Sequence, residues 1–330
     1  MHLVRYLSTG GTSPCVGVQF GEVIHALPIP SVGALLALRQ GEIRDLADAA
    51  ARGTPAGADP MLLPPVDGRM EVWAAGVTYR RSREARMEES ASAHVYDLVY
   101  EADRPELFFK SVAWRTVTNG EPIGLRRDSA LNVPEAELAV VVNAAAEIVG
   151  YAVCNDVSSR SIEGENPLYL PQAKIYAGAC ALSAGIRPAW EVQSADRLTI
   201  TLTIERDSRV VWCGDTSTSQ MRRTPRELVD YLFREMEFPE GVIVTTGTGI
   251  VPEMSFTLHD GDLVTVTIDE VGVLTNRVLI GRDRFAWLAA SNRHEITAAP
   301  QGAGPDVTPT VPGRTALAPG SLTAARGSRQ

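Results

Sequence analysis

Two acidic side chains stand where an apolar segment begins, and this arrangement limits the folds open to the chain. Glu135 and Glu137 are separated by one residue, and Glu137 leads directly into the apolar run 138–142. On a β-strand such residues point to the same face, so both carboxylates would project together. Two like charges that close repel unless a cation lies between them, and oxygen ligands suit Mg²⁺, Mn²⁺ or Ca²⁺. The pattern therefore predicts a strand that starts at a divalent-metal site.

A third acid and a lysine follow farther along the chain. Asp156 comes after a second apolar strand, predicted over 147–153, and could supply a third oxygen ligand. Lys174 stands alone in a segment of Pro, Leu and Ala, a poor choice for a plain surface. Paired acids at a strand start are usually a solvated sheet edge, but buried charges need partners. Because one metal would satisfy all three acids, with Lys174 facing the same cavity, we favour a metal-dependent enzyme site.

Composition argues against several classes of partner. The formal net charge of −9 disfavours a nucleic-acid backbone or an anionic membrane. No apolar run reaches membrane-spanning length, and the first residues lack the apolar core of a signal peptide. The four cysteines are scattered without a CxxC motif, as is typical of reduced thiols. We expect a cytoplasmic protein that acts on a small molecule.

Gly and Pro residues, which favour turns, divide the first part of the chain into short segments, and residues 1–65 are predicted to form a small N-terminal domain. It should contain three short strands and then a helical stretch over 31–51. The segment 62–65 is predicted to be a linker.

The catalytic domain is predicted over 70–290 and is dominated by strands. The segments 199–204 and 263–268 alternate strictly between apolar and polar residues, as half-buried strands do. Helices are expected over 82–100 and 225–235, the second with Thr224 as its N-cap. A Gly-, Pro- and Ala-rich tail, 297–330, carries too little apolar surface to order itself and is predicted to be disordered.

Six motifs in order give the chain a resemblance to the fumarylacetoacetate hydrolase superfamily. They lie at Gly76–Tyr79, Pro134–Leu138, Gly150–Arg160, Lys174, Thr246–Gly249 and His259–Asp262. The resemblance implies an α+β, mainly β fold: a mixed β-roll catalytic domain with a small N-terminal α/β domain. It also implies Mg²⁺, or Mn²⁺ or Ca²⁺, and a homodimer or homotetramer. On the same basis the metal ligands would be Glu135, Glu137 and Asp156, and Lys174 would be the active-site lysine.

Within the superfamily, the segment Glu163–Lys174 looks most like the branch of 2-keto-3-deoxy pentonate dehydratases. The C–C hydrolases of the superfamily carry a His and a Glu that activate water, and this chain has Ser82 and Ala85 at those positions. Without the His there is no obvious base for attack by water, which argues against hydrolysis.

The resemblance thus implies a Mg²⁺-dependent hydro-lyase that removes water from a 2-keto-3-deoxy sugar acid through an enolate held by the metal. Lys174 is predicted to transfer a proton or to hold the enolate, with Glu88, Glu89 or Tyr79 as the second proton shuttle. The substrate-binding residues would be Arg86, Ser82, Thr248 and Gln172.

Two departures from the family pattern leave the exact sugar acid open. Ser161 stands where Asp is usual, and Ser183-Ala184 stands where Gly-Pro is expected. Both positions are predicted to lie near the pocket. One alternative is a metal-dependent C–C hydrolase, decarboxylase or tautomerase of an acylpyruvate or related 2-keto acid. A second alternative, of another class, is a non-catalytic binding protein on the same fold.

Overall fold

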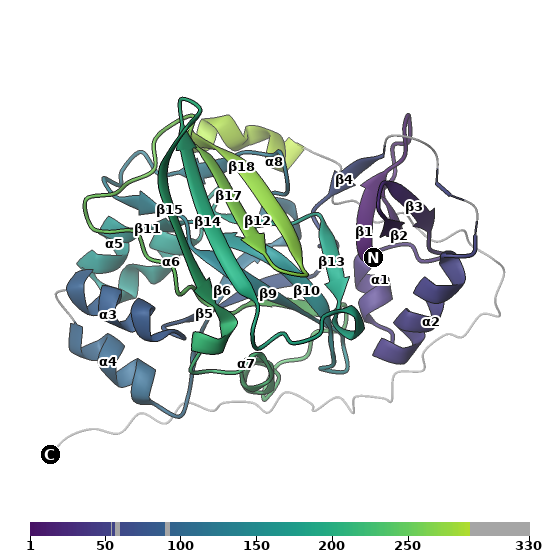
Figure 1. The fold of residues 1–330 in the computed structure, drawn as a ribbon, viewed down its shortest axis with the longest axis horizontal. Helices are drawn as coiled ribbons and strands as arrows, with labels where there is room; N and C mark the ends of the chain where they lie inside the picture. Colours follow the sequence, from purple (N-terminus) through teal and green to yellow (C-terminus); the bar gives the residue numbers. More distant parts are fainter. Residues whose placement is uncertain (54, 57–59, 90–92, 291–330) are drawn as a thin grey trace, which may run out of the picture. The chain divides into compact units, whose positions relative to one another are not determined.

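Two β-sheets carry most of the chain (Figure 1). The structure is a computed structural model that describes residues 1–290 except 54, 57–59 and 90–92. The described residues belong to one compact unit. The predicted tail, 297–330, lies outside the described residues. The division of the remainder into an N-terminal and a catalytic domain stays a prediction.

The larger sheet has eleven strands and runs in the order β3-β2-β1-β13-β10-β9-β16-β5-β6, with β4 added to β1 and β12 added to β10. All of its pairings are antiparallel except that of β16 with β5. Its strands are β1 (His2–Leu7), β2 (Cys15–Phe20), β3 (Val23–Ala26), β4 (Met61–Leu63), β5 (Glu71–Gly76), β6 (Glu106–Val112), β9 (Ala136–Val142), β10 (Ile148–Asp156), β12 (Cys180–Leu182), β13 (Gly185–Pro188) and β16 (Val242–Thr245).

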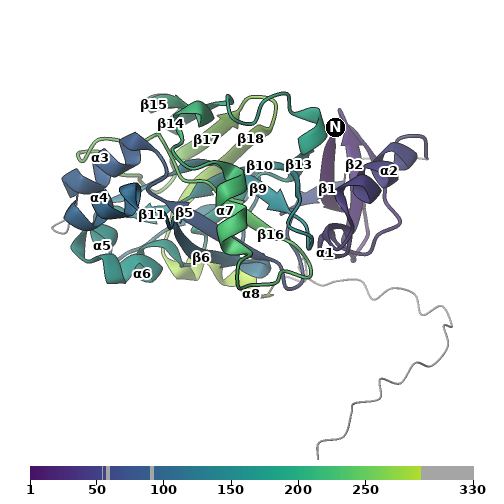
Figure 2. The same ribbon diagram turned by 90° about the horizontal axis from the view of Figure 1, so that it is seen from below.

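The second sheet has five strands in the order β15-β14-β17-β18-β7 and packs across the middle of the first (Figures 1 and 2). The alternating segments predicted as strands are confirmed, because β14 and β17 bury every second side chain. These side chains join those of β9, β10 and β16 in one apolar core. The strands are β7 (Ile123–Leu125), β14 (Thr199–Arg206), β15 (Arg209–Ser217), β17 (Leu263–Ile268) and β18 (Gly272–Ile280), and a separate pair is formed by β8 (Asn132–Val133) and β11 (Ser158–Ser159).

Helices lie around the sheets rather than between them (Figure 2). The predicted cap of α7 is confirmed, because the Thr224 side chain accepts a hydrogen bond from the Glu227 amide. Among the described residues, no helix is long and apolar enough to cross a membrane. The α-helices are α1 (Val32–Leu36), α2 (Gln40–Ala50), α3 (Arg80–Glu89), α4 (Ala93–Glu101), α5 (Arg160–Glu165), α6 (Leu170–Lys174), α7 (Pro225–Leu232) and α8 (Ala286–Ala290), and the 3₁₀ turns are η1 (Ala113–Arg115), η2 (Pro167–Tyr169), η3 (Ala189–Glu191), η4 (Thr218–Gln220) and η5 (Arg282–Phe285).

The N-terminal segment is part of the larger sheet. Strand β1 pairs with β13, with Leu3 opposite Ile186, and strand β4 pairs with β1. The predicted linker is therefore wrong in its first half, because Met61–Leu63 is a strand. The helical stretch predicted over 31–51 is confirmed, and it is divided into α1 and α2 by a break at residues 37–39.

Candidate metal centre and active site

Neighbouring strands bring the three predicted acids together. Strands β9 and β10 are antiparallel, and their register sets Glu137 opposite Cys154. At the end of that ladder the Asp156 amide donates to the Glu135 carbonyl at 3.0 Å, and the Glu135 amide donates to the Asn155 side chain at 3.1 Å. One carboxylate oxygen from each of Glu135, Glu137 and Asp156 lies within 4.8 Å of the others, and all three residues are buried.

Three buried carboxylates at this distance carry a high electrostatic cost. Burial raises the pKa of Glu137 well above its usual range, and the charges of Asp156 and Glu135 raise it further. The Gly247 amide offsets part of this cost by donating to Glu137 Oε2 at 2.7 Å. An all-oxygen set around a shared point is the donor chemistry that Mg²⁺, Mn²⁺ and Ca²⁺ prefer. The residues present therefore fit a divalent cation.

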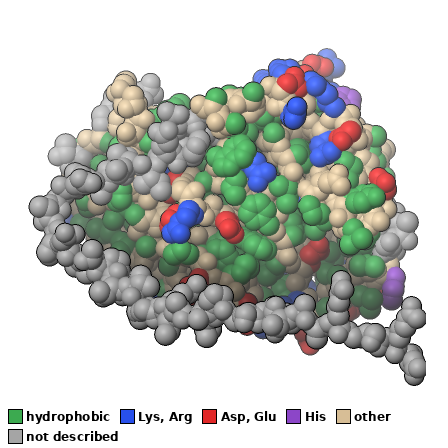
Figure 3. Space-filling view, turned by 180° about the vertical axis from the view of Figure 1, so that it is seen from behind, with side chains coloured by type: hydrophobic (Ala, Val, Ile, Leu, Met, Phe, Trp, Pro, Cys, Tyr) green, Lys and Arg blue, Asp and Glu red, His purple; other side chains and the backbone are tan. Residues whose placement is uncertain are grey.

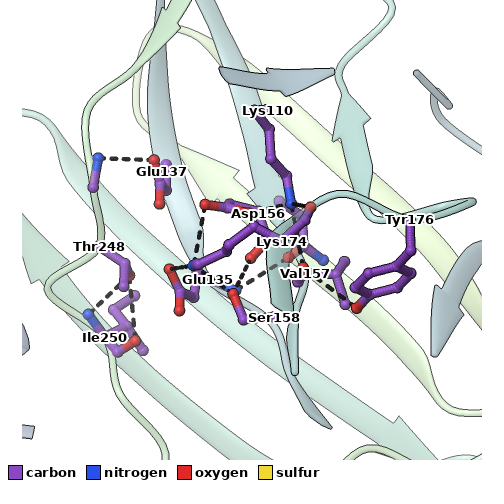
Figure 4. Close-up of polar contacts among 12 residues, drawn as sticks. Lys110, Glu135, Glu137, Asp156, Val157, Ser158, Lys174, Tyr176, Thr248 and Ile250 are labelled. Atoms are coloured by element: carbon purple, nitrogen blue, oxygen red, sulfur yellow. Dashed lines mark hydrogen bonds and ion pairs between the residues drawn. The ribbon is translucent and has the colours of Figure 1, made fainter. Parts of the chain in front are cut away.

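Lys174 ends helix α6 and points its ammonium group into the acidic cluster (Figure 4). Its Nζ lies 2.7 Å from Glu135 Oε2 and 3.2 Å from Asp156 Oδ2, and it donates to Ser158 Oγ at 2.5 Å. The side chain is only 3% exposed. A buried ammonium beside two carboxylates can neutralise one of them and can also move a proton.

A cavity opens beside this cluster, and three charged residues that the sequence did not point to also line it: Glu106, Arg160 and Glu163. Glu106 begins strand β6 opposite Gly76, and a Cβ built on Gly76 would lie only 2.1 Å from Glu106 Oε2. A larger residue at Gly76 would therefore displace this carboxylate from its present position. Arg160 is buried at the start of α5 and donates to the carbonyl of Pro252 at 2.8 Å. An acid at the start of an apolar strand, the signal that drew attention to Glu137, is repeated at Glu106.

The other predicted site residues divide into three groups. Ser82 and Thr248 line the cavity, although the Ser82 hydroxyl is bonded to the backbone of Tyr79 and that of Thr248 to Ile250. Tyr79 is buried and does not line the cavity, and Gln172 is exposed and does not line it either. The geometry therefore does not support direct substrate contact by these two. The side chains of Arg86 and Glu89 lie outside the described residues.

Ser161 and Ser183, which were expected near the pocket, do not line the cavity, although Ser161 directly follows the lining residue Arg160. Ser161 is hydrogen-bonded to Ser129 at 2.9 Å, and Ser183 accepts from the amide of Val153 at 3.0 Å, in the interior of the larger sheet. Neither lines the cavity, and Ser183 and Ala184 border a different hollow beside strand β1. These departures from the family pattern therefore contribute no side chain to the cavity wall.

Comparison with known proteins places this architecture in a known family. A curated relative in Haloferax volcanii, named as a probable 2-keto-3-deoxyxylonate dehydratase, is 50% identical over 65% of this chain and 73% of its own length. In Saccharolobus solfataricus a 2-dehydro-3-deoxy-D-arabinonate dehydratase is 45% identical over 63% of this chain and 71% of its own length.

Solved structures give the same result. A crystal form of 2-keto-3-deoxyarabinonate dehydratase is 37% identical, with a TM-score of 0.75 over 86% of this chain and 100% of that one. The 2-keto-3-deoxy-D-arabinonate dehydratase complexed with magnesium and 2,5-dioxopentanoate is 35% identical, with a TM-score of 0.74 over 85% and 99%. The model of the fumarylacetoacetate (FAA) hydrolase C-terminal domain matches residues 71–279. This match includes strands β9 and β10, which carry the clustered carboxylates, and Lys174. The chain therefore belongs to the fumarylacetoacetate hydrolase family.

Proposed function

We propose that the protein is a Mg²⁺-dependent dehydratase, a hydro-lyase, of a 2-keto-3-deoxy sugar acid. The observation that carries the proposal is the buried set of Glu135, Glu137 and Asp156 with Lys174 at the wall of one cavity. The dehydratase relatives, one of them complexed with magnesium and 2,5-dioxopentanoate, support the same reaction.

The three carboxylates would hold the ion, which supplies Lewis acidity that polarises the substrate's keto group and acidifies its C3 protons. Dehydration then breaks a C3–H bond and the C4–O bond, and the hydroxyl leaves as water. Lys174 would take the C3 proton as a neutral amine, after its ammonium has given up a proton to solvent when the divalent cation replaces it beside the carboxylates; its Nζ lies at the cavity wall. Glu106 lines the same cavity and is placed to protonate the departing hydroxyl.

The substrate carboxylate needs a cationic partner, and Arg160 meets this need. Its guanidinium is buried at the cavity, where a planar fork can bind a carboxylate through two parallel hydrogen bonds. Arg160 thereby takes the substrate-binding role predicted for Arg86. Ser82 occupies the position of the hydrolases' His, and its hydroxyl is engaged by the Tyr79 backbone rather than by a water-activating pair.

The direct test is Mg²⁺-dependent turnover of racemic 2-keto-3-deoxy pentonate, with 2,5-dioxopentanoate followed by mass spectrometry. Glu137→Gln should abolish turnover, and the exposed Glu22→Gln should leave it unchanged. Oxaloacetate and an acylpyruvate are assayed in parallel. Faster turnover of either compound than of the pentonate would replace the dehydratase by a decarboxylase, tautomerase or C–C hydrolase.

We also propose that the protein is a homodimer or homotetramer. Large apolar side chains are exposed on the chain, including Leu168 at 83% and Trp114 at 40%. Hydrophobic side chains also gather over the middle of the face opposite to that of Figure 1 (Figure 3). Contiguous apolar surface of this kind is typical of subunit contacts. Light scattering coupled to gel filtration measures the mass, and a monomer at micromolar concentration would contradict the proposal.

The cysteines support the proposed cytoplasmic location. All four, Cys15, Cys154, Cys180 and Cys213, are free thiols, which suits a reducing compartment. Fractionation of the source cells with an antibody against the protein would test the location.

A further inference from the structure

Lysine is used at only two positions in this chain, and both lie at the candidate site. The sequence contains 31 Lys and Arg residues, of which Lys110 and Lys174 alone are lysines. Both are buried, at 1% and 2% exposure, and both form ion pairs with Asp156. Arg carries the positive charge everywhere else. The two lysines therefore mark places where a compact ammonium is needed and a planar guanidinium would not serve.

Lys110 reaches Asp156 from strand β6, on the opposite side of that carboxylate from Glu135 (Figure 4). Its Nζ makes a close ion pair with Asp156 Oδ1, whereas Lys174 approaches Oδ2. The same Nζ donates to the carbonyl of Lys174 at 2.5 Å and to that of Val157 at 3.3 Å. Lys110 does not line the cavity, so it can act on the reaction only through these partners.

We propose that Lys110 is a positioning residue that holds both Asp156 and the backbone of Lys174. The inference rests on the proposed function. It assigns proton transfer to Lys174 and the positioning of Asp156 and Lys174 to Lys110. Lys110 keeps one oxygen of Asp156 occupied and neutralised, so that the other oxygen faces the metal position. By holding the carbonyl at the end of α6 it also fixes where the Lys174 side chain begins.

The charges of the cluster explain why two ammonium groups are needed. Three carboxylates face two ammonium groups in the metal-free site, and all five groups are buried. When a divalent cation binds, Lys174 must exchange contacts with Glu135 and Asp156 for contacts in the cavity. Lys110 can stay in place through this exchange, because it does not line the cavity and two of its three oxygen partners are backbone carbonyls. One ammonium is thus free to move and the other is fixed.

Nitrogen-15 labelling of lysine tests this division in the wild-type protein without any substrate. The spectrum should contain two side-chain Nζ signals, and a Lys174→Met variant identifies which belongs to Lys110. On addition of Mg²⁺ the Lys174 signal should shift and the Lys110 signal should stay in place. Equal shifts of both signals, or movement of Lys110 alone, would overturn the proposal. Neither result depends on which substrate the enzyme takes.

Substitution of Lys110 gives an independent test, because neutralisation and positioning predict opposite changes in Mg²⁺ affinity. If Lys110 only neutralised charge, Lys110→Met would leave a more negative site and bind Mg²⁺ more tightly. Positioning predicts the opposite, a weakening of about 10- to 100-fold, as for other groups that orient metal ligands. Lys110→Arg should not restore affinity, because a fork cannot meet the same three oxygens. Calorimetry with Mg²⁺ alone measures this, and tighter binding by Lys110→Met would reject positioning.

Loss of stability needs its own control, because removal of one partner of a buried ion pair is destabilising anywhere. Arg5→Met is the matched variant, since Arg5 and Asp67 form a buried pair, each 2% exposed, far from the metal ligands in the chain. Both variants should lower the melting temperature, but only Lys110→Met should change the Mg²⁺ Kd and lower kcat more than it raises KM. Equal effects of the two variants on the Kd would reduce Lys110 to a structural residue.

Discussion

At the scale of single residues, Glu137 couples metal binding to protons. Its pKa is raised above the usual range by burial and then by Asp156 and Glu135, so the metal-free site holds a proton that a cation must displace. Mg²⁺ binding should therefore release a proton and strengthen as the pH rises through and above the ordinary carboxyl range. Calorimetry in buffers of different ionisation enthalpy measures the release. A Mg²⁺ affinity independent of pH over that range would contradict the prediction.

Glu106 should matter for turnover and not for the metal. Glu106→Gln keeps the shape of the side chain but removes its acid–base function, so kcat should fall by about 10²- to 10⁴-fold. The Mg²⁺ Kd should stay unchanged, because Glu106 is not among the clustered carboxylates. Glu205→Gln, at the end of strand β14, is the matched control for loss of a carboxylate. A lower Mg²⁺ affinity in Glu106→Gln would instead make this residue part of the metal site.

Some residues of the site could be identified from the sequence, and others could not. The grouping of Glu135, Glu137 and Asp156 follows from the two-residue period of strands and from the order of the motifs. Arg160 was missed because its role depends on a contact with Pro252, 92 residues away in the sequence. Lys110 was missed because its partners Asp156 and Val157 also lie far along the chain, Val157 by 47 residues. No local pattern contains such contacts.

At the scale of elements, the turn after strand β16 holds Glu137 in place. Gly247 has a φ of +83°, and a Cβ there would lie 2.1 Å from Thr78 Oγ1, while its amide donates to Glu137. Gly247→Ala should therefore lower the free energy of unfolding by about 1–3 kcal/mol and weaken Mg²⁺ binding. Gly261→Ala is the control, since its φ is +89° but nothing lies within 4 Å. Urea denaturation and calorimetry compare the two, and equal Mg²⁺ affinities would contradict the prediction.

The same scale explains the break within the helical stretch predicted over 31–51. The carbonyl of Leu36 accepts from the Ala144 amide, and that of Leu38 accepts from the Asn143 side chain. These carbonyls serve the turn between β9 and β10 instead of continuing a helix. The apolar pattern of the segment gave the correct buried face, with Leu35, Leu36 and Ile43 in the core. It could not show the break, because the partners lie about a hundred residues away in sequence.

At the scale of the whole molecule, the N-terminal segment completes the sheet that holds the site. Residues of β1, β2, α1 and α2 share one apolar core with β9, β10 and β16. Deletion of residues 1–65 should therefore expose the edge of β13 and this core, and the fragment should aggregate or lose cooperative unfolding. Gel filtration and thermal melts measure this. A monodisperse fragment that still binds Mg²⁺ would show instead that the predicted catalytic domain folds alone.

The placement of the two lysines has a consequence for chemical labelling. Amine-reactive esters and cross-linkers usually map the outside of a protein through its many surface lysines. Here every lysine side chain is buried beside the acidic cluster, so such reagents would find no lysine on the outside of the folded chain. Modification of Lys110 or Lys174, detected in peptides by mass spectrometry, would instead record how often the interior opens. The rate of lysine modification by such a reagent would thus measure how often the active site opens to solvent.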